Sequence, residues 1–133
     1  MESRRYRIAL ADAYHDEAEM YRTSLEHYGF DVTCITVPDV GDAAETIACV
    51  RPDAVVTRIL PGRFGVLLTE ELRKDPRTTN IPIIVITSLS QPEALTSVRS
   101  AGADEIVLLP SAPDDLANVI TRCTKERRPT RAR

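Results

Sequence analysis

Short apolar runs alternate with longer amphipathic segments from one end of the chain to the other. The apolar runs are rich in valine, isoleucine and threonine, which favour strands. The segments between them repeat their apolar residues every three or four positions, as a helix with one buried face does. The pattern predicts strands at 6–11, 31–37, 53–57, 81–87 and 104–109, and helices at 16–29, 41–51, 66–74, 90–102 and 111–127.

Strand–helix units joined by short links are typical of a parallel sheet that is covered by helices on both faces. The strand at 81–87 is the most apolar, so we expect it near the centre of the sheet. Binding sites in such sheets form where the strands end. This rule selects residues 11–13, Thr57, Arg58, Thr87, Ser88 and Leu109.

Composition and charge exclude several kinds of partner. The chain has 133 residues, 43% of them apolar and 28% charged, which suits one soluble domain. It has neither the apolar run of about 20 residues that a membrane helix needs nor a signal peptide, so we expect a cytoplasmic protein without a membrane partner. The net charge is −3, but residues 125–133 carry five positive charges and one negative, which leaves −7 for the rest. A body this acidic should not bind nucleic acid. We therefore divide the chain into a domain at 1–124 and a basic, solvated tail at 125–133, which could also contact an acidic partner.

Residues that often carry chemistry are scattered. Cys34, Cys49 and Cys123 lie far apart in apolar patterns, so we expect reduced core cysteines. His15 and His27 stand alone and are expected at the surface. The sequence contains no glycine-rich phosphate loop, metal cluster or catalytic triad, so it does not indicate an enzyme.

Three segments resemble the receiver domain of two-component response regulators by their order and spacing. They are RIALADAYHDEAEMYRTSLEHYGFDV at 7–32, PDAVVTRILPGRFGVLLTEELRKDPRTTNIPIIVITSLS at 52–90, and SVRSAGADEIVLLPSAPDDL at 97–116. The resemblance covers about residues 6 to 124. It implies a CheY-like, flavodoxin-like doubly wound (βα)5 fold, with a five-stranded parallel sheet in the order 2-1-3-4-5.

The resemblance also implies where a phosphoryl group would be held. Receiver domains carry it on an aspartate that ends the third strand, four residues before a loop proline. Counting back from Pro61 gives Thr57. Their pair of acids for Mg²⁺ aligns with Asp12 and Ala13, and their lysine aligns with Leu109.

Two further positions belong to the switch that receiver domains use. The hydroxyl that ends the fourth strand is kept as Thr87, whereas Ile106 stands where an aromatic residue is common. The acceptor, one acid, the lysine and the aromatic residue are therefore replaced together.

These replacements remove the charges that phosphoryl transfer needs. A threonine hydroxyl needs an adjacent base before it can attack, and Asp12 is the nearest candidate. With a single carboxylate, Mg²⁺ binding should be weak or absent, so we expect no cofactor. Arg58 could substitute for the metal by pairing with Asp12, although alternation along a strand should turn it away from Thr57.

The leading hypothesis is a pseudo-receiver that is independent of phosphorylation and acts by binding another signalling protein or itself. The alternative is a working receiver with a non-standard acceptor, either Thr57 or a nearby acid such as Asp12 or Asp53. An enzymatic or small-molecule α/β domain and a part of a transcription factor are less favoured interpretations.

Two surfaces are candidate partner sites. One lies around the rim of the pocket in which receiver domains hold the phosphoryl group, where we expect Phe64, Leu67 and Leu109. They would form an exposed patch there, unless Phe64 folds inward as a cap of the pocket. By analogy with receiver domains, the face of the fourth helix, fifth strand and fifth helix, which includes Arg99 and Arg122, could form a homodimer.

Overall fold

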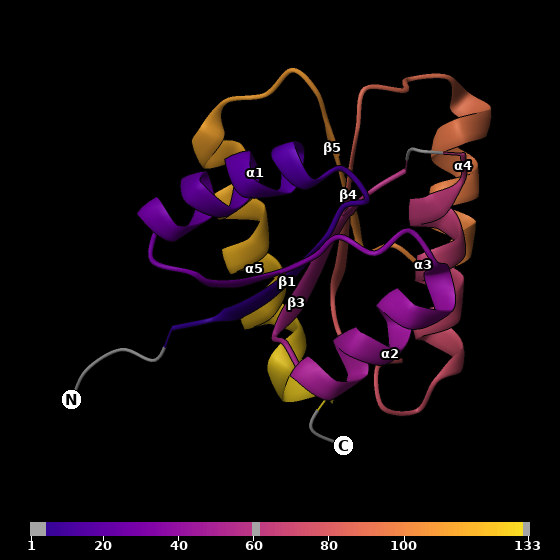
Figure 1. Ribbon diagram of the computed structural model, residues 1–133, viewed down its shortest axis with the longest axis horizontal. Helices are drawn as coiled ribbons and strands as arrows, with labels where there is room; N and C mark the ends of the chain where they lie inside the picture. Colours follow the sequence, from indigo (N-terminus) through magenta and orange to yellow (C-terminus); the bar gives the residue numbers. More distant parts are fainter. Residues whose placement is uncertain (1–4, 60–61, 132–133) are drawn as a thin grey trace.

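The computed structural model describes residues 5–59 and 62–131. Its strands form one parallel sheet in the order β2-β1-β3-β4-β5, so the predicted fold is confirmed. Figure 1 shows the helices on both sides of this sheet. The elements are β1 (Arg7–Ala11), α1 (His15–His27), β2 (Asp31–Ile35), α2 (Val40–Val50), β3 (Ala54–Arg58), α3 (Phe64–Lys74), β4 (Ile83–Thr87), α4 (Pro92–Ala101), β5 (Glu105–Leu108) and α5 (Pro113–Arg131).

Element boundaries differ from the predicted ones where local chemistry intervenes. Strand β4 begins at Ile83 rather than at residue 81, because Pro82 has no N–H to give to the sheet. Helix α3 begins at Phe64, before the predicted start at residue 66. Helix α5 continues to Arg131, beyond the predicted domain boundary at residue 124. In the described part of the chain, no helix has both the length and the apolar character needed to cross a bilayer.

Side chains alternate between the two faces of the sheet. Leu10, Val56 and Ile86 pack in the core cluster under α1 and α5, whereas Val55 and Val85 pack under α2, α3 and α4. Figure 1 shows the same two layers, with α1 and α5 on one side and the other three helices opposite. All five residues are fully buried, as expected of strands that are covered on both faces.

Glycine allows α3 to start directly on the end of β3. A Cβ atom on Gly65 would lie 2.4 Å from the Arg58 carbonyl oxygen. The Gly65 N–H donates to the carbonyl oxygen of Ile59 at 3.0 Å. The first turn of α3 is thus packed against the strand end that carries Thr57.

At the opposite edge, Arg73 connects α3 with the entries to two strands. Its guanidinium donates to the carbonyl oxygens of Gly102, Thr79 and Ile81 at 3.0, 3.0 and 2.7 Å. It also forms an ion pair with Asp104 at 2.7 Å, and both side chains are largely buried. One side chain therefore joins α3, the end of α4, and the segments before β4 and β5.

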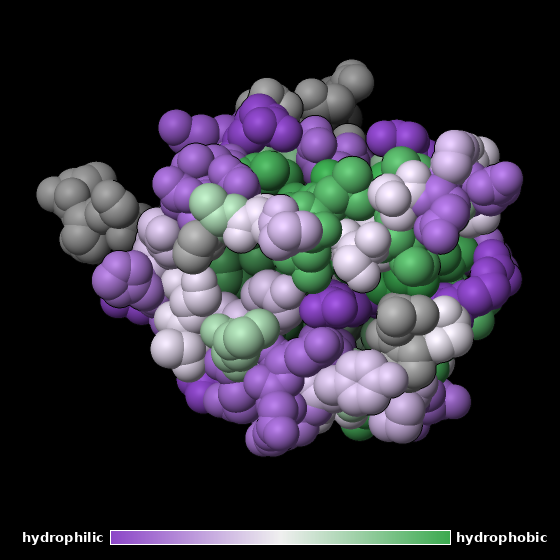
Figure 2. All heavy atoms as spheres, turned by 90° about the horizontal axis from the view of Figure 1, so that it is seen from above, coloured by the Kyte–Doolittle hydropathy of each residue, from purple (hydrophilic) through white to green (hydrophobic). Residues whose placement is uncertain are grey.

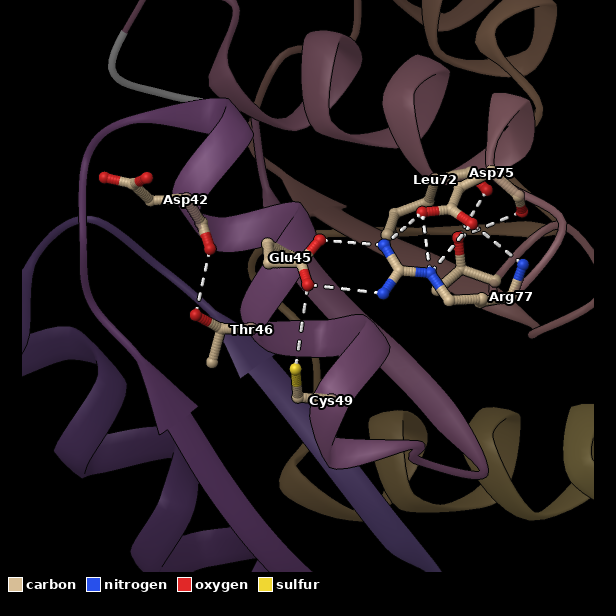
Figure 3. A network of polar contacts seen from close by, with 8 residues as sticks. Asp42, Glu45, Thr46, Cys49, Leu72, Asp75 and Arg77 are labelled. Atoms are coloured by element: carbon tan, nitrogen blue, oxygen red, sulfur yellow. Dashed lines mark hydrogen bonds and ion pairs between the residues drawn. The ribbon is translucent and has the colours of Figure 1, made fainter.

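Arg77 links α2 to the segment after α3 at the surface. Figure 3 shows its guanidinium between Glu45 and Asp75, each 2.7 Å away. Cys49 donates its thiol to Glu45 at 3.8 Å and is exposed, so the prediction of a core position is wrong for this cysteine. Its helical position simply lies on the outer face of α2. Cys123 is buried as predicted.

Candidate functional site

The carboxyl ends of the strands bring the predicted site residues to one edge of the sheet. Ala11 lies beside Thr57 in the pairing of β1 with β3, and Thr87 lies beside Leu108 in the pairing of β4 with β5. Figure 2 looks onto this edge and shows hydrophobic residues gathered near its middle, with hydrophilic ones around them. Pro61, from which the position of Thr57 was counted, lies outside the described residues.

Thr57 is buried and its hydroxyl is already used. The Oγ1 atom donates a hydrogen bond to the carbonyl oxygen of Ala11 at 2.9 Å, and Thr57 is 0% exposed. The bond joins the ends of β3 and β1. The acceptors near Oγ1 are the backbone carbonyl oxygens of Ala11 and, at 3.4 Å, Arg58, so no carboxylate among the described residues accepts the Thr57 proton and activates the hydroxyl.

Asp12 is also buried, and only half of its carboxylate is satisfied. Its Oδ1 atom accepts a hydrogen bond from the N–H of Tyr14 at 2.9 Å. Its Oδ2 atom is buried and accepts no hydrogen bond from any described residue. Burial raises the pKa of Asp12 from 3.8 to about 6, the N–H of Tyr14 opposes the rise, and the nearby carboxyl of Glu17 adds to it.

Arg58 supplies the positive charge near this carboxylate. Its Nη1 atom lies 3.4 Å from Oε1 of Glu17 and donates to the hydroxyl of Tyr21 at 3.3 Å. Its guanidinium carbon lies 5.9 Å from the centre of the Tyr21 ring, within the range of a cation–π contact. As expected from alternation along β3, this side chain turns away from Thr57 and toward α1, and its ion pair is with Glu17 and not with Asp12, the pairing that the sequence had left open. The charge of Arg58 still lowers the pKa of Asp12 in part.

The other predicted positions bring no charge to the site. Ala13 is half-buried, and Leu109 is half-buried against the core under α1 and α5. Ile106 packs on the opposite core. The Thr87 hydroxyl accepts a hydrogen bond from the N–H of Leu89 at 3.0 Å, so it caps the turn that follows β4.

Comparison with known proteins decides the family. The sequence signature of the response regulator receiver domain matches residues 8–121. The chain belongs to the response regulator receiver domain family. Receiver domains are signalling modules of two-component systems that interact with other signalling proteins.

Two relatives illustrate how far the sequence similarity of this receiver domain extends. It is 33% identical over 116 residues to the phosphate regulon transcriptional regulatory protein PhoB of Rhizobium meliloti, covering 85% of this chain and 50% of PhoB. It is 30% identical over 105 residues to PhoB of Pseudomonas aeruginosa, covering 76% of this chain and 45% of that protein. The chain therefore spans about half the length of these relatives.

Solved structures share the fold of this receiver domain. The signal receiver domain of a signal transduction histidine kinase from Syntrophus aciditrophicus superimposes with a TM-score of 0.81 at 24% identity, covering 92% of each chain. The receiver domain of a sensor histidine kinase from Pseudomonas aeruginosa PAO1, with a magnesium ion in its active site cleft, gives 0.80 at 21% identity, covering 92% of this chain and 99% of that one.

The predicted rim patch requires a correction. Phe64 is only 4% exposed and packs in the core under α2, α3 and α4, because it is the first residue of α3 and turns inward. It is too buried to form part of a partner surface, and its inward position is confirmed, whereas its role as a cap of the pocket stays a prediction. Leu67 is 39% exposed, so a surface contact remains open to it.

The second candidate surface is polar and partly paired within the chain. Arg99 is exposed on α4. Arg122 of α5 forms an ion pair with Glu105 of β5 at 3.1 Å. Any contact of Arg122 with a second copy would therefore have to compete with this internal pair.

The alternative acceptor Asp53 lies at the wrong edge. Its Oδ2 atom accepts a hydrogen bond from the N–H of Arg7, the first residue of β1, at 2.7 Å. It precedes β3, whereas Thr57 is near the end of that strand. Asp53 is thus separated from Asp12 by the length of the sheet.

Sequence reasoning missed Glu17 and Tyr21. Both lie on α1, four residues apart, so they share one face of the helix. That spacing, together with an arginine at the end of β3, was the available signal. It was not decisive, since the pattern alone does not show which strand end a helix face meets.

Replacement of Arg58 tests how much its positive charge offsets the repulsion between the carboxylates of Asp12 and Glu17. We expect Arg58→Met to lower the free energy of unfolding at pH 8 by about 1–2 kcal/mol, because Asp12 and Glu17 then face each other without a cation. Arg58→Lys keeps the charge but not the planar contacts, so its loss should be smaller. Urea unfolding followed by circular dichroism measures both. Equal stability of Arg58→Met and the native chain would show that the cation has no such role.

Proposed function

We propose that this receiver domain signals without phosphorylation, by binding another signalling protein or a second copy of itself in a two-component pathway. The observation that supports this proposal most directly is the hydrogen bond from the Thr57 hydroxyl to the Ala11 carbonyl oxygen, at 2.9 Å. The residue at the acceptor position is a structural link between two strands. In this proposal the receiver domain is a cytoplasmic binding module and not an enzyme.

The residues around this link do not fit Mg²⁺. A magnesium ion in a protein is usually held by carboxylates, with several waters kept. Here Ala13 and Thr57 are neutral, Asp12 is the only acid among the three positions, and a guanidinium lies within 3.4 Å of the neighbouring Glu17. Weak or absent Mg²⁺ binding is therefore part of the proposal.

A working receiver with a different acceptor has less support. Thr57 lacks a base, and Asp53 lies at the amino edge of the sheet. Asp12 is a carboxylate at the right edge, but burial raises its pKa to about 6, and Leu109 supplies no cation for the phosphoryl oxygens.

The face of α4, β5 and α5 is the proposed site for a second copy. It carries Arg99, Arg122 and Glu105, so it has both signs of charge. A two-fold contact could exchange the internal pair of Arg122 and Glu105 for the same pair across the interface. No binding of nucleic acid by the acidic body and no membrane contact is proposed.

Incubation with acetyl phosphate and Mg²⁺ tests the proposal. We expect the intact mass of the protein to stay unchanged, because the acceptor position holds a neutral alcohol and no cluster of acids, histidines or cysteines among the described residues could hold a metal ion. A conventional receiver domain treated in parallel serves as the control. A stoichiometric gain of one phosphoryl group would contradict the proposal, and peptide mapping would then identify the acceptor.

A further inference from the structure

A cavity of about 350 Å³ lies between α1 and α5. Its floor includes Ile86 of β4 and Val107 of β5, which are 1% and 7% exposed. Leu116 of α5 and Met20 of α1 form parts of opposite walls. The volume falls within the range of small-molecule sites in proteins.

Small residues on both walls leave this space open. Ser24 of α1 lines one wall, and Ser111 and Ala112 line the other at the start of α5. Leu109 adds apolar surface where the family resemblance places a lysine. A lysine at this position would bring a charge to the cavity, so its replacement changes the chemistry of the space as well as that of the acid site.

None of the described residues that line the cavity carries a charge. Burial of an unpaired ionic group against such walls is costly, whereas a neutral apolar molecule gains by leaving water. The hydroxyls of Ser24 and Ser111 can each donate and accept a hydrogen bond. Met20 is 58% exposed, and its flexible side chain can adapt to an occupant.

We propose that this cavity binds a neutral, mostly apolar small molecule of about two fused rings that carries one hydroxyl or carbonyl group. The serine hydroxyls would orient the polar group and the floor would take the rings. A small molecule fits better than a protein side chain from a partner, because the floor lies below the surface and is lined on two sides by helices.

Occupancy of the cavity would reach the acid site through Tyr21. The ring of Tyr21 lines the cavity, while its hydroxyl accepts the hydrogen bond from Arg58 at 3.3 Å. A ligand against the ring would hold the tyrosine and therefore the arginine that pairs with Glu17. The proposal does not depend on the phosphorylation state, since neither Thr57 nor Asp12 lines the cavity.

Titration with 2-naphthol, a neutral two-ring alcohol with its own fluorescence, tests this site. We expect saturable binding of one molecule per chain and a rise in the melting temperature of the receiver domain. Indole, which has a similar size and a single N–H donor, should compete. Absence of saturable binding up to the solubility limit of 2-naphthol would overturn the proposal.

Two substitutions locate the binding. Ser24→Leu fills the cavity and should weaken 2-naphthol binding about tenfold or more. Thr23→Leu is the matched control, because Thr23 is exposed on the same helix and does not line the cavity. Ala112→Leu fills the space from the opposite wall and replaces Ser24→Leu if that variant does not fold.

Equal binding of 2-naphthol by the filled and the control variants would place the probe elsewhere and refute the assignment. Self-association without ligand should also be the same in all variants. If it changes in Ser24→Leu and Ala112→Leu but not in Thr23→Leu, a second copy of the chain covers the cavity and the proposal is refuted.

Discussion

A receiver domain carrying Ala13→Asp, Thr57→Asp and Leu109→Lys together is expected to accept a phosphoryl group from acetyl phosphate, whereas we expect the native chain to accept none. The three changes restore an ionised nucleophile, a second acid for Mg²⁺ and a cation for the phosphoryl oxygens. The strand ends already hold these positions at one edge, as the pairing of Ala11 with Thr57 shows. Intact mass spectrometry should show a gain of one phosphoryl group that requires Mg²⁺.

The same variant should also become dependent on the metal for its stability. Three acids in a buried cluster repel one another, so its melting temperature should fall in a chelator and rise again with Mg²⁺. The uncharged set Ala13→Asn, Thr57→Asn and Leu109→Met is the matched control and should respond to neither. If the charged variant binds Mg²⁺ but gains no phosphoryl group, then restoring these three positions is not sufficient for phosphoryl transfer.

Asp12→Asn is expected to stabilise the receiver domain at pH 8 by on the order of 2 kcal/mol and to have little effect at pH 4. The folded-state pKa of Asp12 lies at about 6, above its ordinary value of 3.8. Between these values the folded protein holds a proton that the unfolded chain has released. The contribution of Asp12 to the free energy of unfolding therefore falls as the pH rises through this window and is constant above it. Asparagine has the same shape without the charge, so it avoids the cost of ionisation.

The difference between two pH profiles isolates this effect. Glu45 and Asp75 have pKa values that are lowered by Arg77, and their contributions are lost at low pH in both proteins alike. Urea unfolding of the native chain and of Asp12→Asn should give a gap that opens between pH 4 and pH 6. A constant gap across the pH range would show that Asp12 titrates normally, and Asp31→Asn, an exposed change at the start of β2, provides the baseline.

The position of the site residues could be predicted from the sequence, because the apolar pattern shows where each strand ends and the alternation of strands and helices predicts parallel pairing. Thr57, Asp12 and Thr87 each end or follow an apolar run, and parallel pairing brings all three to one edge of the sheet. The sequence alone also shows that two of these side chains are neutral alcohols and one is an acid. The alternative acceptor Asp53 begins the predicted strand at 53–57, so the same reasoning places it at the other edge, where the structure has it.

Side-chain partners were less predictable, since they depend on helix rotation and on where a helix begins. The ion pair of Arg58 with Glu17 requires α1 to turn that face toward β3. Phe64 precedes the predicted helix at 66–74, but the close approach that Gly65 permits starts α3 earlier and turns the ring into the core. Neither effect is visible in the spacing of apolar residues.

Arg73 gives the domain a practical advantage for protein engineering. It fixes the amino edge of the sheet through three backbone carbonyls and Asp104, at the end opposite Asp12 and Thr57. Because this joint lies at the far end of the sheet, we expect exchanges near Thr57 to leave it intact and the strands in register. New binding or phosphorylation sites grafted at the carboxyl ends of the strands should therefore be compatible with the fold.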